Sequence, residues 1–260
     1  MNLTDTHCHI HEDDYGLDPD ETIISARDSG VGKLICVGTT AGSSVKAAEF
    51  VKNRDNVWFS IGQHPHEAKD FGETEKSMMK SLVGDDNLVA VGECGLDYWY
   101  SHSSKPDQEE CLRWQLDLAS QNNLPVIFHN RGSKDNPRDA FDDLWRILDG
   151  YKAIRGVVHS FSADSNILEQ ILERDLIVGI NGIMTFTKDS AQLEALDAVP
   201  LDKILLETDA PYLTPPPFRG SINEPKHLVE VAKFIANRKG VNLKSLAKVT
   251  SETVSQIFSI

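Results

Sequence analysis

A chain of 260 residues with 40% hydrophobic and 25% charged residues has the composition of a globular protein with a large buried core, which excludes an intrinsically disordered chain. The formal net charge of −14 opposes attraction to phosphate backbones, and Lys and Arg are scattered, which excludes a passive nucleic-acid-binding protein. An enzyme with this net charge can still bind phosphate when bound divalent cations make the site locally positive. No segment is apolar for long enough to span a bilayer and no signal-peptide pattern is present, so we expect a cytoplasmic protein with no membrane partner and no obligate protein partner.

Short β-rich runs recur along the chain, and each is followed by a stretch that reads as a helix. The runs are nearly continuous and apolar, which is typical of parallel strands covered on both faces. We predict strands over residues 3–9, 33–38, 57–62, 88–92, 125–129, 156–161, 176–180 and 204–208. We predict helices that include residues 20–29, 43–52, 107–121, 138–148 and 166–174, and two or three more over 224–260 with breaks near Gly240 and Thr250.

About eight such pairs indicate a single domain over residues 1–260, built either as a closed (β/α)8 barrel or as an open doubly wound sheet. The pattern alone does not choose between them. Polar side chains at the ends of several strands favour the barrel, which collects its functional groups at the carboxyl ends of the strands. The segment 211–217, which is rich in proline, follows the last strand, so we expect an ordered loop that forms a wall of the active site.

The four cysteines show no CxxC spacing, and we predict that all of them are buried, reduced thiols. They are Cys8, Cys36, Cys94 and Cys111. Alternation along a strand turns Cys8 away from His7 and His9, and Cys94 away from Glu93, which are candidate metal ligands.

Residues of the metal-ligand type fall at the ends of five different predicted strands. His7 and His9 are two residues apart, so both side chains point to the same side of the first strand and can grip one cation. The others follow the fourth, fifth, sixth and eighth strands: Glu93, His129, His159 and Asp209. Imidazole and carboxylate ligands without thiolates suit Zn, Mn, Co, Ni or Mg, and a carboxylate such as Glu93 can bridge two ions. A centre of two divalent cations follows as the hypothesis.

The remaining histidines have weaker signals. His64 follows the third strand, and we expect it to contact a phosphate or a leaving group. His11 is expected to face solvent, and three others are interpreted as surface or supporting residues: His66, His102 and His227.

Seven ordered segments make the chain resemble the TatD family of metal-dependent deoxyribonucleases, which belongs to the amidohydrolase-type barrels. The resemblance covers nearly the whole chain and rests on DTHCH (5–9), GQHP (62–65), GECGLDY (92–98), LPVIFH (124–129), VHSFS (158–162), LETDAPYL (206–213) and FRG (218–220).

The resemblance implies a (β/α)8 barrel with two divalent cations, Mg, Mn or Zn, and DNA as the substrate, as a single strand or at its ends. One ion would be bound by His7, His9, Glu93 and Asp209, and the other by Glu93, His129 and His159. The sequence departs from the family at 130–135, where Asn-Arg-Gly-Ser-Lys-Asp replaces the usual short Arg-Asp-Ala, and at Val254, where an Asn is expected. We expect the first departure to alter the rim of the site and the second to concern packing.

Two cations about 3.5 to 4 Å apart can activate a water and stabilise the attacked and leaving oxygens of a phosphate ester. We expect Asp209 to accept the proton of that water, and His64, with Arg131 or Arg219, to hold the phosphate. The site features predict a metal-dependent hydrolase, and the resemblance implies that it cleaves phosphodiester bonds as a deoxyribonuclease, with 3'-5' exonuclease activity as one form. Two alternatives stay open: a hydrolase of a small amide, lactone or carboxylic ester, and a non-catalytic metal-binding scaffold. Glu93 in place of a bridging Lys favours phosphoesters.

Overall fold

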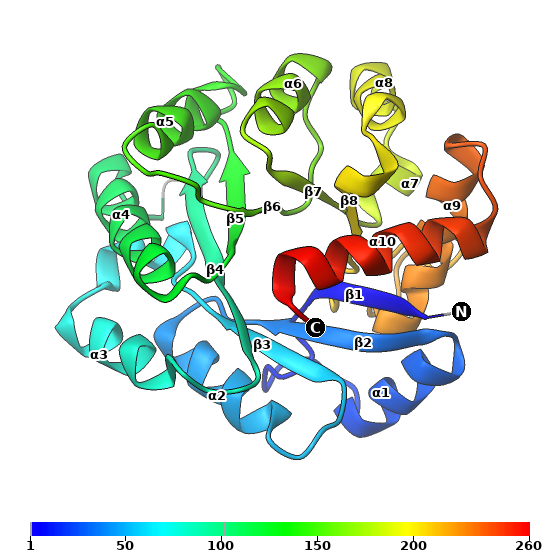
Figure 1. Ribbon diagram of the computed structural model, residues 1–260, viewed down its shortest axis with the longest axis horizontal. Coiled ribbons are helices and arrows are strands. Elements are labelled where there is room, and N and C mark those ends of the chain that lie inside the picture. The colour runs from blue at the N-terminus through cyan, green and yellow to red at the C-terminus, as the bar shows by residue number, and fades with distance from the viewer. Residues whose placement is uncertain (1, 101) are drawn as a thin grey trace. The chain divides into compact units, whose positions relative to one another are not determined.

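The computed structural model describes residues 2–100 and 102–260, which alternate between parallel strands and helices (Figure 1). The strands are β1 (Leu3–Cys8), β2 (Val31–Val37), β3 (Val57–Ile61), β4 (Leu88–Asp97), β5 (Val126–Arg131), β6 (Gly156–Val158), β7 (Ile177–Ile180) and β8 (Ile204–Leu206). The helices are α1 (Pro19–Asp28), α2 (Ala41–Val51), α3 (Glu73–Leu82), α4 (Lys105–Asn122), α5 (Asp139–Leu148), α6 (Ser165–Glu173), α7 (Ile183–Phe186), α8 (Ser190–Ala198), α9 (Leu228–Arg238) and α10 (Leu243–Phe258). Three short 3-10 turns complete the order: η1 (Pro65–Asp70), η2 (Leu201–Lys203) and η3 (Pro225–His227).

These elements form two compact units. The first contains residues 2–36, 55–57 and 160–260, and the second contains 37–54, 58–100 and 102–159. In the second unit β3, β4, β5 and β6 pair in parallel, and the pairs between β4 and β5 run from Val91 with Val126 to Asp97 with Arg131. Helices α4 and α5 pack against β4 and β5, on the outer side of these strands in Figure 1.

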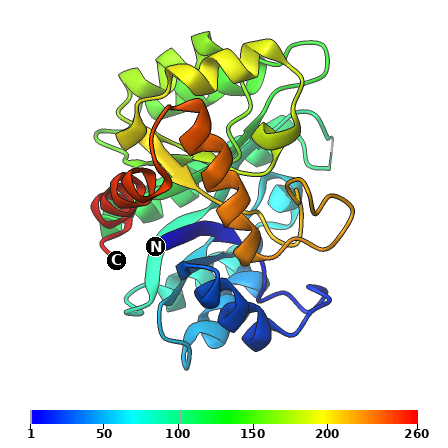
Figure 2. The ribbon, with the colours of Figure 1, turned by 90° about the vertical axis from the view of Figure 1, so that its right-hand side faces the viewer.

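In the first unit, the last strand, β8, lies beside the first strand, β1. β7 pairs with β8, and β8 lies beside β1, where the hydroxyl of Thr6 donates to the carbonyl of Leu206 at 3.1 Å. β1 pairs in turn with β2. Figure 2 shows α9 and α10, the two helices that follow β8, beside β1, and both contact β1 and β8.

The order of the strands decides between the two predicted architectures. The sheet runs from β1 to β8 in chain order, and β8 meets β1, so the sequence of neighbours is circular. A doubly wound sheet instead reverses its strand order and leaves two open edges. The fold is therefore a (β/α)8 barrel with additional C-terminal helices, as the polar strand ends predicted.

Local sequence signals explain where the helices begin. The carboxylate of Asp18 accepts hydrogen bonds from the backbone N–H groups of Asp20 and Glu21, and Pro19 occupies the first turn of α1. The N-terminus of α6 has the same kind of cap, because Asp164 accepts from the N–H groups of the first turn. Such caps satisfy backbone donors that no helical partner reaches.

Several boundaries differ from the predicted ones, and two of them, in β4 and in α10, are the most informative. β4 does not stop at residue 92 but continues to Asp97, because its ladder with β5 extends through Leu96 and Asn130. The predicted helix break near Gly240 is confirmed, but the one near Thr250 is wrong, since α10 runs from Leu243 to Phe258. The hydroxyl of Thr250 donates to the carbonyl of Leu246, four residues earlier, which keeps this buried polar group inside the helix.

Candidate metal centre

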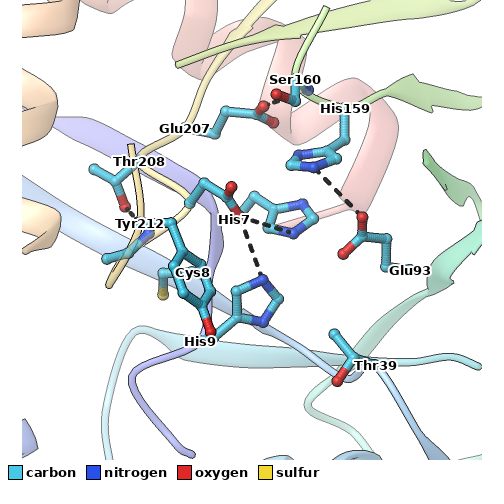
Figure 3. Close-up of polar contacts among 12 residues, drawn as sticks. His7, Cys8, His9, Thr39, Glu93, His159, Ser160, Glu207, Thr208 and Tyr212 are labelled. Carbon is cyan, nitrogen blue, oxygen red and sulfur yellow. Dashed lines mark hydrogen bonds and ion pairs between the residues drawn. The ribbon is translucent and has the colours of Figure 1, made fainter. Parts of the chain in front are cut away.

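In the first unit, His7 and His9 at the end of β1 face Asp209, which follows β8. Nε2 of His9 lies 3.4 Å from Oδ1 of Asp209, and Nε2 of His7 lies 3.8 Å from the same oxygen (Figure 3). The two rings meet edge to face with their centroids 5.0 Å apart. The backbone N–H of Asp209 donates to the carbonyl of His7 at 2.8 Å, which sets the position of the carboxylate. Two imidazoles and one carboxylate oxygen thus converge, as strand alternation predicted for the histidines.

Asp5, on β1, contacts Thr208, the residue that precedes Asp209. Its carboxylate is fully buried and accepts hydrogen bonds from the N–H of Thr208 at 2.9 Å and from the Thr208 hydroxyl at 2.5 Å. Burial raises the pKa of Asp5 to about 8, although the bonds from Thr208 oppose the shift. The contact ties β1 to the residue before Asp209. Asp5 and Thr208 lie within the segments 5–9 and 206–213 that carry the family resemblance, but their sequence positions alone predicted no role for them.

In the second unit, one oxygen of Glu93 faces three imidazoles. Oε1 of Glu93 lies 2.7 Å from Nδ1 of His129, 3.4 Å from Nε2 of His159 and 3.6 Å from Nε2 of His64. Figure 3 shows the ring of His159 directed at this carboxylate. The ligand atoms of His64, Glu93 and His129 all lie within 4.8 Å of one another, a spacing that can hold a metal ion. The donor set therefore fits a divalent cation.

His64 occupies a different electrostatic position from His129. Burial, together with the nearby charge of His129, holds the pKa of His64 well below its ordinary value, so the ring is neutral. Nδ1 of His64 accepts a hydrogen bond from the N–H of His66 at 3.2 Å. The neutral ring therefore carries its proton on Nε2, the atom that points toward Glu93. In this state His64 is a hydrogen-bond donor and not a metal ligand, which suits contact with a phosphate oxygen.

Asp97, four residues beyond Glu93 on β4, completes the surroundings of His129. Its Oδ2 lies 2.9 Å from Nε2 of His129 and 3.1 Å from Nε2 of His66. Burial alone would raise the pKa of Asp97, but the hydrogen bond with His129 outweighs it and holds the pKa well below its ordinary value. Burial likewise opposes charge on His129, and hydrogen bonds with Asp97 and Glu93 overcome it and raise the pKa of the ring. The sequence placed Asp97 in the motif of residues 92–98, and its spacing of four from Glu93 was the signal that could have identified it.

Glu207, a third carboxylate outside the predicted set, lies beside Ser160, the residue that follows His159. Oε1 of Glu207 accepts the N–H of Ser160 at 2.6 Å, as Figure 3 shows, and Asn181 donates to the Ser160 hydroxyl at 2.8 Å. Gly179 leaves room for this carboxylate, because a Cβ there would lie 2.1 Å from Oε2 of Glu207. These contacts fix the backbone at the turn after β6.

The structure corrects the position of one histidine. His11 was expected to face solvent, but its residue exposure is only 7%, and Nε2 lies 3.4 Å from Oε1 of Glu12. Burial lowers the pKa of His11, yet hydrogen bonds with Cys36 and Glu12 outweigh it and raise the pKa to about 9. The chain turns after β1 and brings His11 beside Cys36 of β2, a contact that an isolated sequence position does not reveal.

The other three histidines have supporting positions. His66 is half-buried against Asp97, and His102 is exposed beside Tyr100. His227 is buried, where Nδ1 lies 3.1 Å from Oδ1 of Asn223. The four cysteines are buried and free, as predicted.

The two predicted phosphate-binding arginines have protein contacts of their own. Nη1 of Arg131, on an exposed side chain, lies 3.9 Å from Oδ2 of Asp97. Nη1 of Arg219 donates to the carbonyl of Thr214 at 2.9 Å, and its guanidinium lies 3.8 Å from the centre of the Phe186 ring. The bond to Thr214 crosses the loop after β8, so Arg219 helps to order the segment that was expected to form a wall of the site.

The barrel and its groups of imidazoles and carboxylates define a metal-dependent hydrolase, because these ligands lie at the carboxyl ends of strands, where such enzymes carry their sites. A family model described as TatD related DNase matches residues 4–259. The chain belongs to this family.

Known relatives agree with this assignment over nearly their full length. The uncharacterized metal-dependent hydrolase YabD of Bacillus subtilis (strain 168) is 34% identical, with 99% of each chain covered. The 3'-5' ssDNA/RNA exonuclease TatD of Cronobacter sakazakii (strain ATCC BAA-894) is 32% identical, over 98% of this chain and 97% of its own. The crystal structure of YJJV, a TatD homologue from Escherichia coli K12, superposes with a TM-score of 0.88 at 26% identity, covering 99% of this chain and 98% of its own. None of the described helices is both long and apolar enough to cross a membrane.

Proposed function

We propose that this protein is a nuclease that hydrolyses phosphodiester bonds of single-stranded nucleic acid and releases nucleotides from the 3' end. The observation that carries the proposal is Oε1 of Glu93 facing His129, His159 and His64 in a group without thiolates. Imidazole with carboxylate is the ligand chemistry of metal-dependent hydrolases of phosphate esters. The name of the Cronobacter relative, a 3'-5' exonuclease of single-stranded DNA and RNA, supports the choice of substrate.

Two divalent cations, Mg, Mn or Zn, belong to this proposal. His7, His9, Glu93 and Asp209 would hold one, and Glu93, His129 and His159 the other, as the family resemblance implies. When bound, such cations lower the pKa of a coordinated water and neutralise charge on the phosphate.

The protein's own groups have separate tasks in the proposed reaction. Asp209 accepts the proton of the attacking water at its carboxylate, which lies beside His7 and His9 at the end of β1. His64 donates from Nε2 to a phosphate oxygen, because its Nδ1 is engaged by the N–H of His66. Arg131 and Arg219 supply guanidinium donors to phosphates at the rim.

Two amide variants test the proposal. Asp209→Asn and Glu93→Gln keep the size of each side chain but remove its charge, so each should lower turnover by about 100-fold or more. Hydrolysis is measured with bis(p-nitrophenyl) phosphate and with single-stranded DNA at saturating Mn²⁺, and circular dichroism checks the fold. The matched control is Glu173→Gln, an exposed carboxylate on α6. Wild-type turnover in both site variants would refute the assignment.

A substrate panel tests the reaction itself. Phosphodiesters, lactones and dipeptides are assayed side by side, and we expect turnover of the phosphodiesters to dominate. A single strand labelled at its 5' end should give a ladder that shortens one nucleotide at a time. Preferred cleavage of a lactone or amide would favour the alternative hydrolase, and metal-loaded protein inert on the whole panel would favour a scaffold.

A further inference from the structure

Two loops at the rim of the second unit present exposed aromatic and basic side chains together. Trp99 and Tyr100 follow β4 and are 43% and 44% exposed, and Arg131 and Lys134 lie at and after the end of β5. Because β4 and β5 pair as far as Asp97 with Arg131, the two loops leave neighbouring strands at the same level. We call these four residues the aromatic-basic patch.

Each aromatic ring of the patch has a cation near its face. The Arg131 guanidinium carbon lies 5.8 Å from the centre of the Tyr100 ring, and Nζ of Lys134 lies 5.2 Å from the centre of the Trp99 ring. These are distances at which a cation is attracted to the electron-rich face of a ring. Exposed aromatic rings next to cations form the usual surface for nucleic acid without sequence preference: bases stack on rings, and cations meet phosphates.

The patch is held in a fixed relation to a candidate metal ligand. Oδ1 of Asp97 accepts the backbone N–H groups of Trp99 at 2.9 Å and Tyr100 at 3.1 Å. Oδ2 of the same carboxylate contacts Nε2 of His129 at 2.9 Å. One buried side chain therefore orders the aromatic loop and the imidazole together, which reduces the conformational entropy lost when a ligand binds.

Charge supports the same ligand. A chain with a net charge of −14 repels a polyanion in general, so a place where basic side chains accompany exposed rings is the favourable point of contact. In the patch these basic side chains are Arg131 and Lys134, each near an aromatic ring.

We propose that the aromatic-basic patch binds a single strand of nucleic acid, with bases stacked on Trp99 and Tyr100 and phosphates held by Arg131 and Lys134. This inference rests on the proposed nuclease function and names the part of the protein that selects its substrate. A duplex offers the patch few free base faces, because its bases are already stacked on one another within the helix. The patch therefore discriminates single strands from duplexes.

Binding is measured with a 5'-fluorescein-labelled (dT)12 by fluorescence anisotropy, using the full chain loaded with Mn²⁺ and carrying Asp209→Asn so that the probe stays intact. We expect Trp99→Ala and Tyr100→Ala each to raise Kd by about 5-fold to 100-fold, whereas Trp99→Phe keeps a stacking face and most of the affinity. Annealing the probe to its complement should also raise Kd. The control is Ile24→Ala, which removes a side chain that is 49% exposed on α1.

Salt dependence tests the basic half of the patch. Replacing Lys134 by Ala should reduce the slope of log Kd against log salt by about 0.7, the change expected for one lost phosphate contact on a single strand. Lys188→Ala, at an exposed lysine of the first unit, should leave the slope unchanged.

Hydrolysis of bis(p-nitrophenyl) phosphate separates this inference from the proposed function. In a background with Asp209 intact, Trp99→Ala should leave turnover of this small ester unchanged, since it has no strand to stack. If the enzyme is active but the Trp99→Ala, Tyr100→Ala double variant binds (dT)12 as tightly as wild type does, the patch is overturned and the nuclease function is not. Binding of (dT)12 that depends on Trp99, in a protein that cleaves no phosphodiester, supports the patch and overturns the nuclease.

Discussion

Asp97 connects the imidazoles of the candidate site to the loop that follows β4. One carboxylate meets the imidazoles of His129 and His66 and the backbone of Trp99 and Tyr100. A ligating histidine commonly donates its second ring N–H to a carboxylate, which fixes the tautomer and the direction of the ring. Asp97 therefore has the position of a residue that orients His129 without binding metal itself.

Replacing Asp97 by Asn should weaken metal binding. The amide keeps the volume but loses the charge that orients His129, and such changes lower affinity by about 10-fold to 100-fold. Titration of metal-free protein with Mn²⁺ in a calorimeter measures the effect. The comparison variant is Asp143→Asn, whose carboxylate contacts Tyr98 and Arg146 and no imidazole. Equal affinities in Asp97→Asn and wild type would remove the orienting role.

At the scale of elements, β4 has no room for a side chain where Gly95 faces β5. Gly95 has a φ of +150°, and a Cβ added there would lie 1.9 Å from the carbonyl oxygen of His129. An L-residue would be strained in this conformation, and the clash would be with backbone that cannot move aside. Gly95 therefore allows the ladder that presents His129.

Gly95→Ala should destabilise the fold by about 2 to 5 kcal/mol, the sum expected of backbone strain and overpacking. Urea unfolding followed by circular dichroism gives the free energy of unfolding. Gly42→Ala is the matched control: Gly42 lies in the first turn of α2 without a positive φ or a close neighbour, so stability should stay equal or rise by up to about 1 kcal/mol. A midpoint for Gly95→Ala equal to that of wild type would contradict the steric argument.

The C-terminus of α8 depends on a side chain from the residue that follows α9. Nζ of Lys239 donates to the carbonyls of Leu196, Asp197 and Val199 at 2.6, 2.7 and 2.6 Å. The last carbonyls of a helix have no helical partner, and a cation there also meets the negative end of the helix dipole.

Lys239→Met should therefore lower the free energy of unfolding by about 1 to 3 kcal/mol, because the aliphatic stem remains but the carbonyls lose their donor. Lys233→Met provides the control, since the exposed pair of Lys233 with Glu230 contributes little. Thermal unfolding of the two variants in parallel would show whether the loss belongs to Lys239 alone.

At the scale of the whole molecule, the candidate ligands are not what fills the core. The largest fully buried side chains are apolar, among them Ile35 on β2 and Phe128 on β5. Burial of such side chains contributes about 1.5 to 3 kcal/mol each. The fold therefore has a driving force that does not require a metal ion.

Removing metal should separate activity from folding. After dialysis against EDTA we expect phosphodiester hydrolysis to disappear while far-ultraviolet circular dichroism stays unchanged, and Mn²⁺ should restore turnover. Binding of metal to the folded state alone should also raise the melting temperature with increasing concentration of free ion. Full activity in the chelated protein, with metal absent by elemental analysis, would exclude metal-dependent catalysis.

The sequence was enough for the features that depend on local pattern. Apolar runs located all eight strands, alternation placed His7 and His9 on one side of β1, and the ordered motifs led to the family. These properties are encoded in residues close together along the chain. The assignment of one domain to residues 1–260 and the roles of the site residues stay predictions.

Other features required the fold, because their partners lie far away in sequence. The meeting of β8 with β1 chose the barrel over the open sheet, the ladder with β5 carried β4 on to Asp97, and packing after β1 buried His11. Most of all, a carboxylate acquires a role only from what surrounds it: Asp97 matters through His129, 32 residues away along the chain. Local pattern supplies the chemical groups, but distance, burial and hydrogen bonding between remote segments give them their charge states and orientation.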